Sequence, residues 1–240
     1  MAIKIRSTLD VSADGANIVI YGESGVGKTT LIGHLPRPFV LSADKGLLSI
    51  ADKDIPYIDI ENMQDIDDAY SYIKKNIDKY DNIVFDSLTE IAEVVLFEMK
   101  EDRKDKRQAY GELADAFGVM IRRFRDISGI NTIFLAKRKH IINEDNELVG
   151  YEPMMPGRVL PHGLPYLTDE VFAYVLDRKG TRSFHTTTAR KYPAKDRSGK
   201  LNPIEVAPNL GEIIDRLLSK NSEPKQQAKA HNTKGHIAQI

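Results

Sequence analysis

The chain has 240 residues, 41% of them hydrophobic, which is enough to bury one full α/β core with a short appendage. Its formal charge of -1 and its isoelectric point near 6.6 exclude a globally basic protein, so any nucleic-acid contact must use local basic patches. The absence of cysteine excludes disulfides and thiolate metal sites, and the six histidines are scattered without ligand spacing.

The first residues, Met1–Asp10, carry charges at Lys4 and Arg6 and lack the apolar core of a signal peptide. No apolar run approaches the length that spans a bilayer. We therefore expect a soluble protein without membrane contact in a reducing cytoplasm, the host's cytoplasm if a virus encodes it. Residues 1–13 are expected to form an N-terminal extension.

The first predicted strand, Ala16–Tyr21, leads directly into a phosphate-binding loop. Residues 22–29 read Gly-Glu-Ser-Gly-Val-Gly-Lys-Thr and match the pattern G-x-x-x-x-G-K-[ST] without a mismatch. The glycines let backbone N–H groups turn toward a phosphate, and a helix expected over Thr29–Leu35 points its positive end at the same charge. The alternative is a glycine-rich turn that binds nothing. The predicted nucleotide-binding residues are Gly22, Glu23, Ser24, Gly25, Val26, Gly27, Lys28, Thr29 and Thr30.

Two residues of the loop have separate chemical roles. Lys28 is the point charge expected to reach the β and γ phosphates, and the Thr29 hydroxyl is placed to bind a magnesium ion between them.

After the next predicted strand, Pro38–Ser42, Asp44 can polarise the water that attacks the γ phosphate. The alternative is a turn aspartate before Gly46.

A second acid follows a strand at Tyr57–Ile60 and a helical pattern that begins at Ile66. The apolar strand Asn82–Asp86 ends in a carboxylate, as expected for the partner acid that holds magnesium through its water shell. A helix N-cap at Asp86 or Ser87 is the alternative explanation.

Helical spacing returns around Ile91–Val95 and Leu113–Phe124, with strands predicted at Asn131–Ala136 and Glu170–Leu176. This alternation predicts a mainly parallel sheet covered by helices. Lys137 follows one of these strands, where a side chain can sense the γ phosphate; a solvated charge run is the alternative.

Beyond the core, periodicity stops from Asn143 to Pro165, and the prolines and glycines there predict a long functional loop. Further strands are expected at Arg182–Thr188 and Leu201–Val206, followed by a last helix from a capping-box-like start at Asn209. Residues 14–218 form the predicted domain, and the polar residues 219–240 form a predicted disordered tail.

The order of these motifs resembles the RecA-like ATPases. Three segments, Asp44–Leu47, Val84–Glu90 and Ala194–Leu201, further resemble the phage RecA-like nucleotide-binding proteins, among them a Sak-type single-strand annealing group. The resemblance covers about residues 14–218 and implies a three-layer RecA-like core with ATP and Mg²⁺ as cofactors. It also implies self-association into a filament or a ring.

The same resemblance implies that basic residues of one protomer reach the γ phosphate bound by the next, a role that falls here to Lys195 and Arg197. A basic surface turn around Ser198 is the alternative. The chain departs from the RecA-like pattern at Asp44, where glutamate is usual, and at Lys137, where glutamine or another polar residue is common.

Contacts to single-stranded DNA are implied in two loops, near Lys100–Tyr110 and Arg138–Gly163. Cations supply attraction to phosphates, and Tyr151 can stack on a base. Acidic residues in the first loop make a charge-mixed, exposed helix end equally compatible. The candidate DNA-binding residues are Arg103, Lys104, Lys106, Arg107, Arg138, Lys139, Tyr151 and Arg158.

Together these observations predict an ATP-binding and ATP-hydrolysing, phage-type protein that binds single-stranded DNA and promotes annealing or homologous recombination. The expected turnover depends on DNA, and a single-strand-binding protein is a further candidate partner. One alternative is a nucleotide-gated recombination mediator without catalytic turnover. Another is a P-loop small-molecule kinase, for which Arg182 and Arg190 would supply lid arginines.

Overall fold

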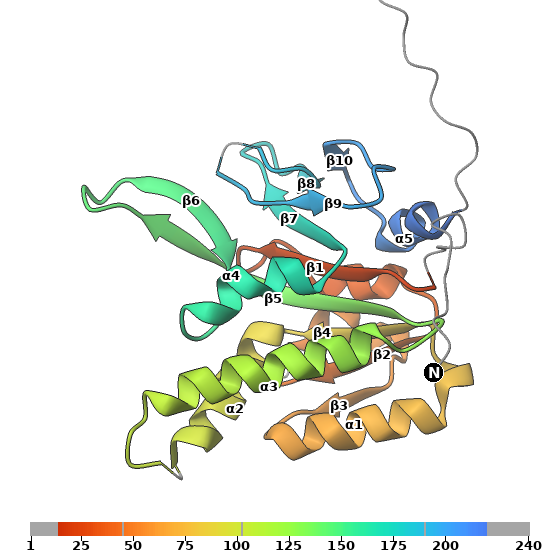
Figure 1. Cartoon of the computed structure of the whole chain (residues 1–240). Coiled ribbons are helices and arrows are strands. Elements are labelled where there is room, and N and C mark those ends of the chain that lie inside the picture. Colours follow the sequence, from red (N-terminus) through yellow and green to blue (C-terminus); the bar gives the residue numbers. More distant parts are fainter. Residues whose placement is uncertain (1–13, 45, 102, 190, 220–240) are drawn as a thin grey trace, which may run out of the picture.

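The computed structural model describes residues 14–44, 46–101, 103–189 and 191–219 (Figure 1). Its strands belong to one mixed sheet, with helices on both faces. The predicted N-terminal extension and, apart from Ser219, the predicted tail lie outside the described residues.

The sheet is mainly parallel. In spatial order it runs β10 (Ile204–Val206), β8 (Arg182–His185), β7 (Glu170–Leu176), β1 (Asn17–Gly22), β5 (Asn131–Ile142), β4 (Asn82–Asp86), β2 (Pro38–Ser42) and β3 (Tyr57–Asp59). Every neighbouring pair from β7 to β3 is parallel, whereas β8 and β10 are antiparallel. Two strands lie off this path: β6 (Leu148–Pro153) pairs with β5, and β9 (Lys195–Asp196) pairs with β7.

Two apolar cores lie on the opposite faces of the sheet. One face packs against α1 (Met63–Lys75), α2 (Leu88–Glu101), α3 (Gln108–Arg125) and α4 (Val159–Leu167). The other packs against the short helices η2 (Thr29–His34) and η3 (Leu47–Lys53) and against α5 (Leu210–Leu218). A last short helix, η4 (Ile77–Lys79), follows α1. Among the described residues, no helix combines the length and apolar character needed to cross a bilayer.

Alternating side chains of β1 divide between these cores. Val19 and Tyr21 enter the core under α1 to α4, while Ile18 and Ile20 enter the other. A strand buried on both faces reads as a continuous apolar run, as this one does in the sequence. The three layers confirm the predicted α/β fold with a mainly parallel sheet and antiparallel strands toward the C-terminus.

The prediction of a long loop from Asn143 to Pro165 is wrong. β5 continues past the expected end at Ala136 to Ile142, and β6 returns beside it as an antiparallel hairpin. Most of α4 also falls in this stretch. Pro161 does not prevent this helix, because it lies in the first turn, where its missing N–H removes no intrahelical hydrogen bond.

The helix expected at Thr29–Leu35 is instead the six-residue 3-10 helix η2. Leu35 precedes a proline and is extended, as the steric restriction before proline favours. The strands expected at Arg182–Thr188 and Leu201–Val206 are shorter in the structure, as β8 and β10. The last helix, α5, begins as predicted, with the Asn209 side chain accepting hydrogen bonds from the backbone N–H groups of Gly211 and Glu212.

A ladder of asparagines closes the edge of the sheet where the parallel strands begin. The buried Asn131 side chain accepts a hydrogen bond from the backbone N–H of Ala16 (2.8 Å) and donates one to the Asn82 side chain (3.0 Å). Asn82 in turn donates to the carbonyl of Pro36 at 2.6 Å. These bonds tie the starts of β1, β4 and β5 to one another.

Replacement of Asn131 by alanine should therefore lower the free energy of unfolding by about 2 to 4 kcal/mol, because two buried polar groups lose their partners. Urea denaturation followed by circular dichroism measures this change. The exposed Asn202→Ala variant is the matched control and should stay within about 0.5 kcal/mol of the wild type. An equal loss in both variants would contradict the proposed importance of the ladder.

Candidate nucleotide-binding site

The parallel register brings the predicted phosphate loop and the acidic strand ends to one edge of the sheet. Gly22, at the end of β1, is opposite Lys137 on β5. Asp86, at the end of β4, is opposite Ser42 on β2, and Asp44 follows two residues later. β5 lies between β1 and β4, and β2 is the next strand beyond β4, so these residues lie at the ends of four neighbouring strands.

The phosphate loop is shaped by glycines and occupied by its own lysine. Gly25 and Gly27 have φ values of 75° and 97°, in the left-handed region that glycine tolerates without a steric penalty. The Lys28 ammonium donates hydrogen bonds to the carbonyls of Gly22 (3.0 Å) and Glu23 (2.9 Å). A phosphate that enters the loop can replace these carbonyl acceptors.

Thr29 and Asp86 lie in direct contact. The Thr29 hydroxyl donates a 2.7 Å hydrogen bond to Oδ2 of Asp86, whose residue is only 3% exposed. Burial raises the pKa of Asp86 to about 6, the charge of Asp44 acts in the same direction, and the Thr29 bond and Lys28 oppose it. A hydroxyl and a carboxylate are hard oxygen donors, so this pair fits the magnesium ion that P-loop sites use.

The charges of the site influence one another. Burial lowers the pKa of Lys28, and the nearby cations Lys137 and Arg138 lower it further, while Asp86 and Asp44 raise it. The Asp44 charge thus influences the pKa values of both Lys28 and Asp86. Its side chain is exposed and accepts a 2.9 Å hydrogen bond from the Gly46 N–H, which is the geometry of the turn alternative.

Lys137 lies at the loop, as its place after the strand predicts, but it has an acidic partner that sequence reasoning missed. Its ammonium forms an ion pair with Glu90, in the first turn of α2. Its backbone N–H donates to the Thr89 hydroxyl at 2.9 Å. In the sequence, Glu90 ends the segment Val84–Glu90 that carries the resemblance, but no local pattern pairs it with Lys137.

Arg138 and Tyr151 lie beside the nucleotide site rather than on an exposed DNA loop, which corrects their expected location. The Arg138 side chain is only 9% exposed and pairs with Glu23 of the phosphate loop at 2.9 Å. Its guanidinium carbon lies 4.3 Å from the centre of the Tyr151 ring. Tyr151 stacks on Tyr192 with ring centres 4.6 Å apart. The hairpin pairing between β5 and β6 turns these side chains inward.

The loop has a second arginine neighbour that the nucleotide-site prediction missed. Nε of Arg182, the first residue of β8, donates a 2.8 Å hydrogen bond to the carbonyl of Val26. No local pattern signals this contact, because the two residues are 156 positions apart.

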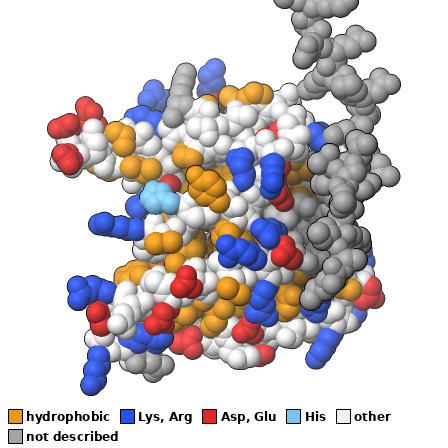
Figure 2. Space-filling model, viewed as in Figure 1, with side chains coloured by type: hydrophobic (Ala, Val, Ile, Leu, Met, Phe, Trp, Pro, Cys, Tyr) orange, Lys and Arg blue, Asp and Glu red, His pale blue; other side chains and the backbone are white. Residues whose placement is uncertain are grey.

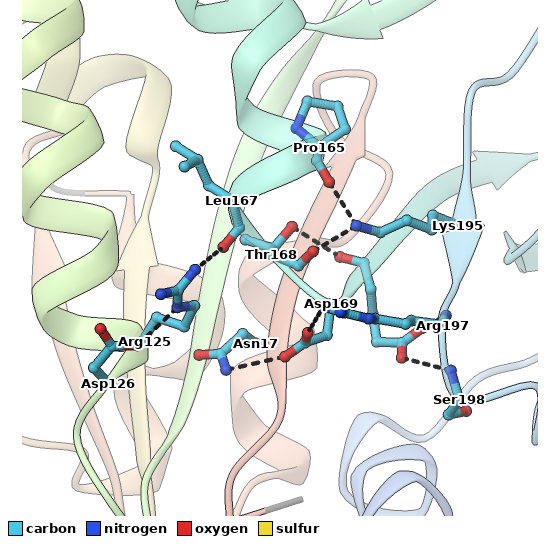
Figure 3. A network of polar contacts seen from close by, with 11 residues as sticks. Asn17, Arg125, Asp126, Pro165, Leu167, Thr168, Asp169, Lys195, Arg197 and Ser198 are labelled. Carbon is cyan, nitrogen blue, oxygen red and sulfur yellow. Dashed lines mark hydrogen bonds and ion pairs between the residues drawn. The ribbon is translucent and has the colours of Figure 1, made fainter. Parts of the chain in front are cut away.

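Lys195 is opposite Val171, near the start of β7, whereas the loop begins at the level of Tyr174, toward the other end of that strand. Figure 3 shows the contacts of Lys195 and Arg197 at this edge of the sheet. Lys195 donates to the carbonyls of Pro165 (2.6 Å) and Thr168 (2.5 Å), and Arg197 pairs with Asp169 at 2.9 Å. Asp169 also accepts from the side chain of Asn17, where β1 begins. Neither cation therefore contacts the phosphate loop.

The remaining DNA candidates divide into paired and exposed cations. Arg103 pairs with Glu112, Arg107 with Asp105, and Lys139 with Glu152. Lys104, Lys106 and Arg158 are exposed. The two predicted DNA segments meet where Gly157 lies against the Tyr110 ring.

The end of the β5–β6 hairpin is acidic. Glu144, Asp145 and Glu147 lie between the two strands, and Figure 2 shows red side chains gathered on the projecting hairpin. The face in that view mixes both charges and carries no continuous basic stripe. The end of the hairpin therefore offers no electrostatic attraction to a phosphate backbone.

Comparisons with known proteins bear on the same region. A family model described as an AAA domain matches residues 14–198. The matched interval runs from the start of β1 past β9 and contains the loop, Asp86, Lys137, Arg182 and Lys195. A comparison with curated proteins finds no match.

The raised pKa of Asp86 predicts that Asp86→Asn stabilises the nucleotide-free protein above pH 6. Because the folded-state pKa lies above the usual value of 3.8, the ionised carboxylate disfavours folding at pH 8. At about 1.4 kcal/mol per unit of pKa, the rise from 3.8 to about 6 corresponds to a gain of about 3 kcal/mol at pH 8, because that pKa already includes the attraction to Lys28.

The gain should decrease as the pH falls through 6, since Asp86 is then protonated in the folded state. Chemical denaturation at pH 5 and pH 8 measures the effect, with the exposed Asp59→Asn variant as control. A variant that is less stable than the wild type at pH 8 would show that the buried carboxylate is not a source of instability.

Proposed function

Because the chain belongs to the AAA domain family of P-loop NTPases, we propose that it binds and hydrolyses ATP with Mg²⁺ at the loop that follows β1. The observation that carries the proposal is the meeting of Lys28, Thr29 and Asp86 at one edge of the sheet, with Thr29 and Asp86 in hydrogen-bond contact. These residues supply the positive charge and the oxygen donors that a magnesium-bound triphosphate requires.

Each residue of the site has a defined task in this proposal. The loop N–H groups cradle the phosphates, and Lys28 exchanges its two carbonyl acceptors for phosphate oxygens. Mg²⁺, when bound, neutralises phosphate charge, with Thr29 and Asp86 as its protein contacts. Asp44 orients the attacking water, and Lys137 responds to the γ phosphate through a shift in its pairing with Glu90.

The location of Lys195 and Arg197 supports assembly. In a head-to-tail arrangement, the edge of one protomer that carries these cations faces the loop edge of the next, so a neighbour's cations complete each site. Such heterologous contacts generate a ring when they close and a filament when they do not. We propose that ATP lies between subunits and favours the assembled state.

The finer proposal is a phage-type RecA-like protein that binds single-stranded DNA and promotes annealing or recombination in the host cytoplasm, alongside a single-strand-binding protein. Its support is the resemblance of Val84–Glu90 and Ala194–Leu201 to such proteins, together with the exposed cations Lys104, Lys106 and Arg158. Tyr151 is stacked on Tyr192, so attraction to phosphates carries more of the proposed binding than stacking does.

One observation favours a second candidate, a nucleotide-gated mediator without turnover. The Asp44 carboxylate is held by the Gly46 N–H in a turn, and in this candidate it has no catalytic task. The two functions differ in one measurable respect, because Asp44→Ala would leave a mediator unchanged.

Turnover measurements test the catalytic proposal. Lys28→Ala should weaken nucleotide binding about tenfold or more, because a charged hydrogen-bond donor to phosphate is lost. Asp44→Ala should retain nucleotide binding and lose most of its ATP turnover. The assay follows phosphate release with and without single-stranded DNA at low salt. Equal turnover in both conditions, together with no DNA binding, would overturn the DNA-dependent part of the proposal.

Mixing variants tests the site between subunits. A mixture of Lys28→Ala with the double variant Lys195→Ala/Arg197→Ala should recover about one quarter of wild-type turnover, because about one random head-to-tail contact in four joins an intact loop to intact cations. A mixture of Lys28→Ala with Asp86→Asn is the control and should recover nothing, since both changes affect the same side of the contact. Recovery in neither mixture would contradict the shared site.

A further inference from the structure

Arg182 reaches over the phosphate loop from a part of the chain remote in sequence. Tyr174 on β7 is in register both with Gly22, where the loop begins, and with Phe184 on β8. β8 is antiparallel to β7, so Arg182, opposite Leu176, lies two residues further toward the loop edge of the sheet. The antiparallel pairing of β7 and β8 thereby places the Arg182 side chain beside the phosphate loop, at the end of the parallel strands.

Arg182 contacts the backbone of two neighbouring loop residues, Val26 and Gly27. Nε of Arg182 donates to the Val26 carbonyl at 2.8 Å, and a Cβ atom built on Gly27 would lie 3.3 Å from the same nitrogen. The guanidinium therefore lies against the part of the loop that has no side chain. Since Gly27 has a φ of 97°, the backbone there already requires glycine.

Arg182 differs from the other cations around the loop in its partners. Arg138 pairs with Glu23, Lys137 pairs with Glu90, and Lys28 donates to two carbonyls. Within the described residues, no carboxylate pairs with Arg182, and its two terminal amino groups have no hydrogen-bond acceptor. The residue is exposed, yet the Nε bond holds its planar group in position.

A guanidinium held at Nε presents its remaining donors in a fixed orientation that suits two phosphate oxygens. Arg182 contacts the loop at Val26 and Gly27, directly before Lys28 in the sequence, so both cations lie at the same phosphate loop. We propose that Arg182 binds the phosphate chain of the nucleotide held by its own protomer. The inference rests on the proposed nucleotide-binding function and adds a contact that the loop motif does not contain.

Binding of Mg²⁺-ADP to the full chain, measured by isothermal titration calorimetry, tests the inference. Arg182→Gln, which retains a side-chain donor but removes the charge, should weaken the affinity about tenfold. Arg182→Lys should give an intermediate loss, because the charge remains without the planar pair of donors. The matched control is Arg178→Gln, an exposed arginine of the same β7–β8 connection, which should stay within about twofold of the wild type.

Two further measurements distinguish a direct contact between Arg182 and phosphate from a role in which Arg182 only stabilises the loop. Arg182→Gln should reduce the salt dependence of Mg²⁺-ADP binding, because one charge-assisted contact is lost. It should also weaken competition by inorganic tripolyphosphate to a similar extent, since that ligand has no base or ribose. An unchanged salt dependence, or unchanged competition by tripolyphosphate, would overturn the inference.

The outcomes also distinguish this inference from the proposed function. If wild type and Arg182→Gln bind Mg²⁺-ADP equally well, the proposed contact of Arg182 with phosphate is wrong, while the proposed nucleotide-binding function is retained. If the wild type does not bind Mg²⁺-ADP, the proposed function itself fails.

Discussion

Parallel pairing from β7 to β3 is the constraint on which the site depends, because it places the ends of separate strands along one edge of the sheet. Gly22 and Lys137 are in direct register, and Asp86 ends the strand on the far side of β5. The Thr29 hydroxyl, at the first residue of η2 directly after the loop, donates to Asp86 at the end of β4. The asparagine ladder at the other edge supports the arrangement, since a slip of β5 would separate Asn131 from both Ala16 and Asn82.

The site holds several like charges close together by giving most of them local partners. Arg138 and Lys137 have carboxylates, Lys28 has two carbonyls, and burial with neighbouring cations lowers the pKa of Lys28. A polyphosphate that enters the loop relieves this crowding of positive charge. An anion at the loop reduces the repulsion among these cations, which favours a strongly charged ligand over a neutral one.

Local patterns predict the parts of the structure that local chemistry determines. β2, β4 and β7 have their predicted bounds because each is an apolar run between polar or turn-forming residues. The meeting of the phosphate loop with Asp86 follows from the rule that parallel strands end at one edge. The prolines and glycines of Asn143–Pro165 mislead, because strand pairing with β5 and packing of α4 outweigh local breaker signals. The contact between Arg182 and Val26 joins residues 156 positions apart and depends on the β7–β8 register, which no window of sequence contains.

The length of β5 has a mechanical consequence. This strand has 12 residues, of which those from Asn131 to Ala136 are buried in the sheet and those from Arg138 onward pair with β6. Lys137 lies between the part of β5 that is buried in the sheet and the part that pairs with β6. From there to Ile142 the strand extends about 16 Å, at about 3.3 Å per residue. A small rotation of the strand at Lys137 therefore gives a larger displacement at the far end of the β5–β6 hairpin. The hairpin can bend at Ile141 and Ile142, where the register between β5 and β6 is irregular.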